Sequence, residues 1–371
     1  MKTILTGNYA VAEAVKLSRV KVIAAYPITP QTTIVERLAE MVESGEIDAE
    51  FVRVESEHSA LAVVYGSSLA GLRSFTATSS HGLLYMYEMC WWVSNARIPL
   101  VMAVVTRTIG PPWNIHTDHT DILTLRDSGW IISMAENAQE ALDLTIQGFK
   151  ISERVNLPFV VGLDAFVVSH TAEVVDVPEQ DLVDSFLPER KQAYVISPDD
   201  PIAVGNIAQN DVTMRLRYDM AKDMERSKEV IREVGDEFEK KFGRKYGLVE
   251  HYMTEDADYV VVMSGAWCGD AKEAVDVLRS RGIPIGLLKL TYLRPFPKEE
   301  LKELEDREVL VVDRSFSMGH RGILGLEVGN VLDCKNVIAG LCGVDMGVED
   351  FVEMFNRFVR GEIEDVEWWL K

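Results

Sequence analysis

The chain has 371 residues, 47% of them hydrophobic, and its 59 acidic against 38 basic residues give a net charge of −21. This length favours two domains, and the apolar content is typical of a globular protein. Because so acidic a surface repels phosphate groups, we expect neither nucleic acid nor membrane as a partner. No run approaches the roughly 20 apolar residues that span a bilayer.

The N-terminus and the cysteines predict a cytoplasmic protein. The first residues break at Gly7-Asn8 before any apolar segment develops, so we expect no secretory signal. The cysteines at positions 90, 268, 334 and 342 are isolated, without a C-x-x-C pair. This excludes a zinc ribbon or an iron–sulfur cluster held by this chain alone. Few scattered thiols are typical of the reducing cytoplasm.

Apolar runs of strand length alternate with helical patterns along the first part of the chain. The helical stretches cover 59–71 and 139–152. Strands are predicted at 20–25, 51–54, 74–78, 100–105 and 159–163. Such alternation predicts βαβ units and therefore an α/β fold with a doubly wound, mostly parallel sheet between layers of helices.

A stretch dense in both charges follows, from about 211 to 245, with apolar residues near one helical face. It predicts a long linker helix across a domain junction. Beyond it, a helical pattern and further strands indicate a smaller α/β domain. We therefore divide the chain into domains 1–247, which includes this helix, and 248–371. The adjacent tryptophans at 368–369 suggest docking on this chain or on a partner.

The seven residues from Tyr26 to Thr32, YPITPQT, connect a buried strand to a helical pattern. Thr29 suits a helix N-cap and Pro30 suits the first helical position. A helix N-terminus presents free N–H groups and a positive dipole end, which suits a carboxylate or phosphate. An ordinary structural cap fits the same local pattern, so the pattern leaves both interpretations open.

Two charged side chains fall where ligands bind in α/β folds. Glu57 lies in the first turn of a helix that Ser56 could cap, where a carboxylate also simply complements the dipole. Arg107 follows the strongest apolar run, at the carboxyl end of a strand. An arginine there can bind a ligand carboxylate or take part in a structural ion pair. Trp113 follows in a rigid loop near the same sheet edge.

No metal site is predicted. His116 and His119 are three residues apart and could share a helix face, but no further ligand stands at a convincing spacing nearby. Asp118 and Asp121 could instead cap a short helix. The glycines of 319–325 depart from G-x-G-x-x-G, so this stretch predicts a strand-to-helix turn rather than a dinucleotide loop.

Motifs in both parts of the chain form a recognisable series. AYPITPQT, VESEHSA and FTATSSHGL come in order and are followed by Arg107, DHTD, RDSGW and LRPFP. The series resembles the alpha subunit of archaeal-type 2-oxoacid:ferredoxin oxidoreductases, the pyruvate and 2-oxoisovalerate enzymes, over nearly the whole chain. The resemblance implies a pyrimidine-binding module of the thiamine-diphosphate type followed by a transketolase C-terminal-like domain.

The resemblance also implies an enzyme that is active only with partner subunits. Pyruvate, CoA and oxidised ferredoxin would give acetyl-CoA, CO2 and reduced ferredoxin through thiamine diphosphate. The G-D-G…N motif for magnesium and diphosphate is missing, since Ala271 follows Gly269-Asp270. A beta subunit would therefore supply Mg2+ and the diphosphate site. Gamma and delta subunits would add contacts and 4Fe–4S clusters, none of them on this chain.

Site roles follow from the same resemblance. Glu57 matches the glutamate that hydrogen-bonds the aminopyrimidine ring and drives formation of the ylide, and Pro27 and Ile28 match further cofactor contacts. Thr29 and Arg107 match residues near the substrate carboxylate. A threonine at position 29 favours a neutral 2-oxo tail over a second carboxylate.

Several alternatives remain open at this point. A branched-chain enzyme acting on 2-oxoisovalerate fits the same motifs, although we expect Trp113 to narrow the substrate pocket and favour a short tail. A lipoamide-linked 2-oxoacid dehydrogenase or a transketolase-like protein would share the cofactor and fold, and partner chains with clusters would argue against both. A non-catalytic scaffold subunit is the third alternative, and intact Thr29, Glu57 and Arg107 count against it.

Overall fold

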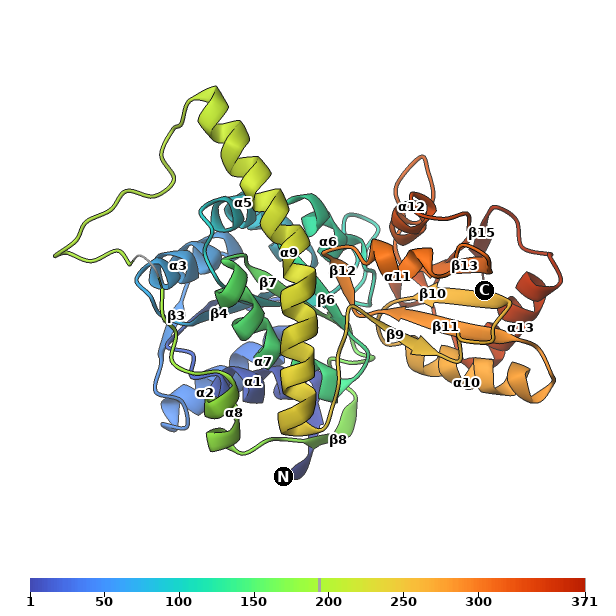
Figure 1. Ribbon diagram of the computed structural model, residues 1–371. Coiled ribbons are helices and arrows are strands. Elements are labelled where there is room, and N and C mark those ends of the chain that lie inside the picture. The colour runs from blue at the N-terminus through green and yellow to red at the C-terminus, as the bar shows by residue number, and fades with distance from the viewer. Residues whose placement is uncertain (193–194, 371) are drawn as a thin grey trace.

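The computed structural model describes residues 1–192 and 195–370, which form two lobes side by side (Figure 1). The first lobe is built on a seven-stranded sheet in the order β12-β6-β7-β5-β4-β2-β3. The second is built on a six-stranded sheet in the order β15-β14-β13-β10-β11-β9. A two-stranded ribbon of β1 (Lys2–Thr6) and β8 (Ala172–Asp176) completes the first lobe.

The large sheet is parallel except for its edge strand β12, which runs antiparallel to β6. Its strands are apolar along their length because helices cover both faces, and all six residues of β5 are buried. The five strands predicted for this part are confirmed to within two residues. The strands are β2 (Val22–Ala25), β3 (Glu50–Arg53), β4 (Ser74–Thr78), β5 (Val101–Thr106), β6 (Ile131–Ala135), β7 (Phe159–Asp164) and β12 (Tyr292–Arg294).

Helices pack on both faces of this sheet. Helices α1, α2 and α7 share one hydrophobic core with it, and α3, α4 and α5 share the other. Alternate residues of a strand point to opposite faces, so Ile23 enters the first core and Ala24 the second. The helices of this lobe are α1 (Gly7–Leu17), α2 (Thr32–Glu43), α3 (Glu57–Leu69), α4 (Ser80–Tyr85), α5 (Tyr87–Asn95), α6 (Thr120–Leu123), η1 (Thr124–Asp127), α7 (Ala138–Val155) and α8 (Gln180–Phe186).

The second lobe repeats the layered plan on a smaller scale. Helices α10 and α13 share a core on one face of the sheet, whereas α11 and α12 contribute to the other. The C-terminal tryptophans belong to the edge strand β15, which pairs with β14. They therefore dock on this chain, which is one of the two predicted alternatives. The elements are β9 (Val249–Tyr252), β10 (Tyr259–Met263), α10 (Cys268–Ser280), β11 (Ile285–Leu290), α11 (Lys298–Lys302), β13 (Glu308–Asp313), α12 (Ile323–Gly329), β14 (Lys335–Ala339), η2 (Leu341–Gly343), α13 (Val348–Val359) and β15 (Val366–Trp369).

The predicted long helix is α9 (Asn210–Phe242), and its N-terminal part projects from the body of the protein (Figure 1). Its C-terminal part is buried against the first lobe, where Phe238 meets Phe186 edge to face. Lys228 forms an ion pair with Glu299 on α11, so the helix contacts both lobes. Within the described ranges, no helix combines the length and the apolar character that crossing a bilayer requires.

Candidate active site

The candidate site lies at the carboxyl ends of β2, β4 and β5. Strands β2 and β4 are neighbours, and the chain leaves β2 toward β3 on one side and β4 toward β5 on the other, so the connections after β2 and β4 diverge at this point. Such a reversal of strand order leaves a crevice that binds ligands in open α/β sheets. The turn after β2, the start of α3, the start of α4 and the loop after β5 all reach this edge.

Glu57 is a nearly buried carboxylate without a partner. It occupies the first turn of α3, and the predicted cap is confirmed, since the Ser56 hydroxyl accepts from the Ser59 N–H at 3.2 Å. The Glu57 residue is 7% exposed. Across the described ranges, its carboxylate forms neither a hydrogen bond nor an ion pair. Buried polar groups normally have partners, so this carboxylate is available to a ligand.

The space in front of Glu57 depends on a glycine in α4. A Cβ atom built on Gly82 would lie 2.6 Å from both Glu57 Oε1 and Thr78 Oγ1. The Thr78 hydroxyl is itself buried and lacks a hydrogen-bond partner among the residues that the structure describes. The Glu57 carboxylate and the Thr78 hydroxyl therefore both pack against the backbone of Gly82. Any side chain at position 82 would displace these two groups.

Arg107 is a nearly buried cation that forms no close ion pair among the described residues. It is 5% exposed, and its Nη1 donates to the Thr29 carbonyl at 2.6 Å. Its Nε is buried without a partner, and among the described residues it joins no ion pair. The guanidinium lies 4.8 Å from the centre of the Trp113 ring. Burial lowers the pKa of Arg107, against the opposing charges of Asp121 and Glu57. The described residues therefore provide no ion-pair partner for the structural interpretation of this arginine.

The predicted cap at Thr29 is also wrong. Helix α2 begins at Thr32 with Gln31 as its N-cap residue, and Thr29 and Pro30 lie in the turn before it. Gln31 fixes this turn, because its Nε2 donates to the carbonyls of Tyr26 and Ala77. The Thr29 carbonyl rather than its hydroxyl contacts the arginine.

Of the two predicted cofactor contacts in this turn, Pro27 is exposed and Ile28 is half-buried. The structure records no polar contact between either of them and Glu57. Their roles, like those of Thr29, Glu57 and Arg107, stay predictions.

Asp121 connects two strand ends beneath the site, which sequence reasoning missed. Its Oδ2 accepts from the backbone N–H of Ser80 and of Arg107, each at 2.9 Å, and its Oδ1 accepts from Ile122. Burial raises the pKa of Asp121 to about 8, although the three N–H donors oppose this. It is fully buried, so it holds the ends of β4 and β5 together rather than only capping α6.

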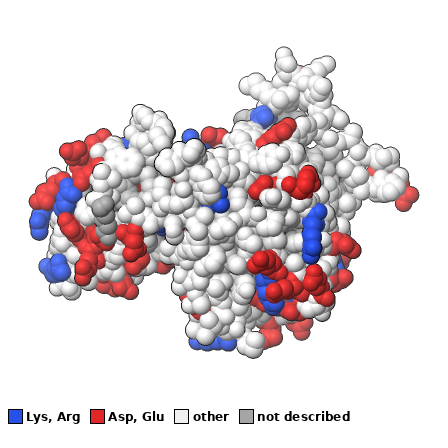
Figure 2. All heavy atoms as spheres, turned by 180° about the vertical axis from the view of Figure 1, so that it is seen from behind, with Lys and Arg blue, Asp and Glu red and all other residues white. Residues whose placement is uncertain are grey.

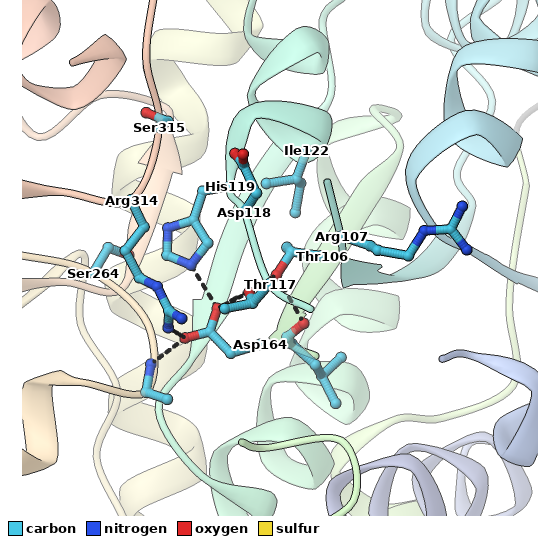
Figure 3. Close-up of polar contacts among 12 residues, drawn as sticks. Thr106, Arg107, Thr117, Asp118, His119, Ile122, Asp164, Ser264, Arg314 and Ser315 are labelled. Carbon is cyan, nitrogen blue, oxygen red and sulfur yellow. Dashed lines mark hydrogen bonds and ion pairs between the residues drawn. The ribbon is translucent and has the colours of Figure 1, made fainter. Parts of the chain in front are cut away.

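Of the two histidines considered for a metal site, His119 belongs to the joint between the lobes (Figure 3). His119 Nε2 lies 2.5 Å from Asp164 Oδ1, and Arg314 of the second lobe binds the other carboxylate oxygen at 3.0 Å. Burial alone would raise the pKa of Asp164, but His119 and Arg314 lower it well below its usual range. His116 instead packs its ring against Phe166, so the two histidines do not share a helix face.

Solved structures place this fold in a known class. A 2-oxoglutarate:ferredoxin oxidoreductase from Magnetococcus marinus, with 2-oxoglutarate, coenzyme A and succinyl-CoA bound, is similar with a TM-score of 0.78 at 21% identity, over 96% of this chain and 65% of that chain. A split-gene transketolase, an inactive beta4 tetramer, is similar with a TM-score of 0.55 at 13% identity, over 96% and 98%. These likenesses confirm the predicted fold class, a doubly wound α/β sheet followed by a second, smaller α/β domain.

Sequence comparison then identifies the family. Residues 13–236 match pyruvate flavodoxin/ferredoxin oxidoreductase, thiamine diphosphate-binding, and residues 257–351 match pyruvate:ferredoxin oxidoreductase core domain II. Ketoisovalerate oxidoreductase subunit VorA of Pyrococcus furiosus is 46% identical, over 94% of this chain and 92% of that protein. Pyruvate synthase subunit PorA of Methanocaldococcus jannaschii is 45% identical, over 98% and 97%. The chain belongs to the pyruvate flavodoxin/ferredoxin oxidoreductase family, and the predicted resemblance is confirmed.

Proposed function

We propose that this chain is the alpha subunit of a 2-oxoacid:ferredoxin oxidoreductase and supplies two parts of its active site. One part holds the aminopyrimidine end of thiamine diphosphate and the other binds the carboxylate of the 2-oxoacid. The observation that carries this proposal is the pairing of a nearly buried carboxylate, Glu57, with a nearly buried guanidinium, Arg107, at one sheet edge. Neither has a counter-ion among the described residues, and a cofactor and a substrate would provide what each lacks.

The residues around Glu57 fit the cofactor. The Glu57 carboxylate and the Thr78 hydroxyl, which has no hydrogen-bond partner among the described residues, converge beside Gly82, so a cofactor ring would find two polar groups there. When bound, thiamine diphosphate supplies the electron sink that lets a 2-oxoacid lose CO2. Glu57 would hold a proton at a pyrimidine nitrogen, and the nearly buried position of its carboxylate would strengthen that hydrogen bond. Pro27 and Ile28 would line the same ring from the turn after β2.

The residues around Arg107 fit a 2-oxoacid carboxylate. Because the guanidinium is little exposed and unpaired, an incoming carboxylate would not have to compete with a protein carboxylate for it. The Thr29 carbonyl and the Trp113 ring hold the guanidinium in place. Trp113 would also limit the length of the tail, which favours pyruvate. The branched-chain 2-oxoisovalerate is the second candidate, since relatives of both kinds are about equally similar.

The surface beside the site supports partner subunits. Tyr26 is exposed, and so are Tyr85 and Trp113, at 62% and 51%. Figure 2 shows a face on which charged side chains gather toward the outer parts of the lobes and are few in the middle. Exposed aromatic side chains and charge-poor surfaces are each typical of protein interfaces. Both relatives are named as subunits, which also favours an assembled enzyme.

We assign the remaining chemistry to those partners. A beta subunit would bind Mg2+ and the diphosphate, and gamma and delta subunits would carry the 4Fe–4S clusters that reduce ferredoxin, while CoA takes the acyl group. We place the complex in the cytoplasm. We also propose that 1–247 and 248–371 are separate domains, because every strand of the six-stranded sheet comes from the second of these parts.

CoA-dependent viologen reduction by the anaerobically purified complex tests this function across a panel of 2-oxoacids. We expect reduction that requires thiamine diphosphate and is fastest with pyruvate. Fastest reduction with 2-oxoisovalerate would select the branched-chain alternative. No reduction with any 2-oxoacid, from a complex with intact clusters and cofactor, would reject the oxidoreductase and favour the scaffold.

A further inference from the structure

His81, in the first turn of α4, lies between the substrate-site arginine and the loop after β5. Its Nδ1 is 3.2 Å from Arg107 Nη2. Its Nε2 is 2.9 Å from the backbone nitrogen of Gly110, which donates to it. The imidazole also stands edge-on to the Trp113 ring, with centroids 5.7 Å apart. The backbone and an aromatic ring therefore fix its orientation.

The hydrogen bonds of this imidazole cannot all be satisfied within the chain. A neutral imidazole has one acceptor nitrogen and one N–H, whereas Gly110 N–H and the guanidinium can only donate. One of the two contacts must therefore set donor against donor. A ring carrying both protons would create that conflict at both contacts.

The better-defined contact identifies the nitrogen that carries the proton. The Gly110 N–H points at Nε2 at the shorter distance, so Nε2 accepts and the proton lies on Nδ1. The Nδ1–H group then faces the guanidinium N–H of Arg107. Its other polar neighbour within the described ranges is the Ser80 hydroxyl, 3.5 Å away, at the limit of a hydrogen bond.

An acceptor is therefore missing at this point, and Arg107 lacks one at its Nε as well. Because the two facing nitrogens are 3.2 Å apart, one oxygen atom can lie about 2.8 Å from both. We propose that His81 is a second recognition group for the substrate carboxylate, which it binds through Nδ1–H beside Arg107. This inference rests on the proposed function and deepens it.

The proposal separates recognition of the carboxylate from recognition of the tail. His81 would contact the group that all 2-oxoacids share, so its loss should weaken short and branched substrates alike. A residue that lines the tail pocket would instead change the ratio between them. The same contact should serve propionate, a carboxylate without the 2-oxo group, which can be used as a competitive inhibitor.

Three substitutions of His81 in the complete complex distinguish its role as a hydrogen-bond donor to the substrate from its role as an acceptor for Gly110. His81→Gln keeps one acceptor and one N–H donor at similar separation, His81→Glu keeps only acceptors, and His81→Met keeps bulk alone. We expect Met to raise KM for both 2-oxoacids by roughly 10- to 100-fold, with a smaller change in kcat and an equally weakened inhibition by propionate. His81→Glu should raise KM more than His81→Met does, because the new carboxylate pairs with Arg107. His81→Gln should keep KM close to the wild-type value.

A purely structural role, as an acceptor for Gly110, predicts a different result. In that case His81→Met would lower kcat or thermal stability while inhibition by propionate kept its wild-type strength, and that result would overturn the proposal. An unchanged KM in His81→Met would overturn it too. His251→Met, on β9 of the second lobe, is the matched control and should leave KM unaltered. If the wild-type complex itself turns over no 2-oxoacid, the proposed function fails rather than the assignment of His81.

Discussion

Removal of the Arg107 guanidinium should weaken use of the 2-oxoacid far more than a surface arginine would. The side chain is nearly buried, and its attraction for a carboxylate 4 Å away is about 4 kcal/mol at an effective dielectric constant of about 20. Losing one partner of a desolvated charge pair costs about 2–5 kcal/mol. Since about 1.4 kcal/mol is tenfold, kcat/KM for Arg107→Ala should fall by roughly 30- to 5,000-fold.

The assay is steady-state viologen reduction by the reconstituted complex, with thiamine diphosphate content measured in the same samples. Arg19→Ala is the control, because Arg19 pairs with Asp184 on the surface and should change kcat/KM little. The kcat/KM of Arg107→Lys should lie between those of Arg107→Ala and Arg19→Ala, since lysine keeps the positive charge but lacks the planar guanidinium. A value of kcat/KM in Arg107→Ala within about threefold of wild type, at full cofactor occupancy, would refute the reasoning.

Four further substitutions test other parts of the account. Glu57→Gln should nearly abolish turnover while leaving subunit assembly intact by gel filtration; near-normal activity would remove Glu57 from the chemistry. Asp121→Asn should raise KM and destabilise the chain by about 1–3 kcal/mol in urea, because an amide N–H would face a backbone N–H; unchanged unfolding would contradict this. Trp113→Ala should shift the kcat/KM ratio toward branched 2-oxoacids, and no shift would exclude it from the tail pocket. Asp164→Asn should cost about 3–5 kcal/mol, because it leaves Arg314 buried without its counter-charge. Since the folded state lowers the pKa of Asp164, its stabilisation is present above pH 4 and is lost only as the pH falls through the folded pKa; a wild-type advantage over Asp164→Asn that shrinks between pH 8 and 5 would contradict this.

Buried parallel strands were the easiest part of the fold to predict. Strand β5 is apolar over six residues because both of its faces are covered, and such a run is visible in the sequence alone. Strand β6 was missed although all five of its residues are buried. Strand β12 was missed because three residues from the far part of the chain pair with β6 in the other lobe, and no local pattern encodes that partner. The tryptophans of β15 were predicted to dock on this chain or on a partner, and they form an edge strand paired with β14 of this chain.

Those parts of the site could be predicted that follow from ligands binding beyond the carboxyl ends of strands in open α/β sheets. Arg107 directly follows β5 and Glu57 opens α3, so their placement at one edge follows from the parallel sheet. The cap at Thr29 was wrong because Gln31 bonds to a carbonyl of β4, 46 residues away, and a local motif cannot show this. The role of Asp121 was missed for the same reason, because two of its hydrogen-bond donors, the backbone N–H groups of Ser80 and Arg107, lie at the ends of other strands. His81 lies in the first turn of the helix that follows β4, so its position near the end of that strand could have identified it from the sequence.

A structure of the anaerobic complex with thiamine diphosphate and a 2-oxoacid tests the central claim most directly. The account predicts a pyrimidine nitrogen within about 3 Å of the Glu57 carboxylate and the substrate carboxylate against Arg107, with the diphosphate held by another subunit. A cofactor bound elsewhere in the complex, with Glu57 and Arg107 covered by a partner chain and contacting neither ligand, would contradict it.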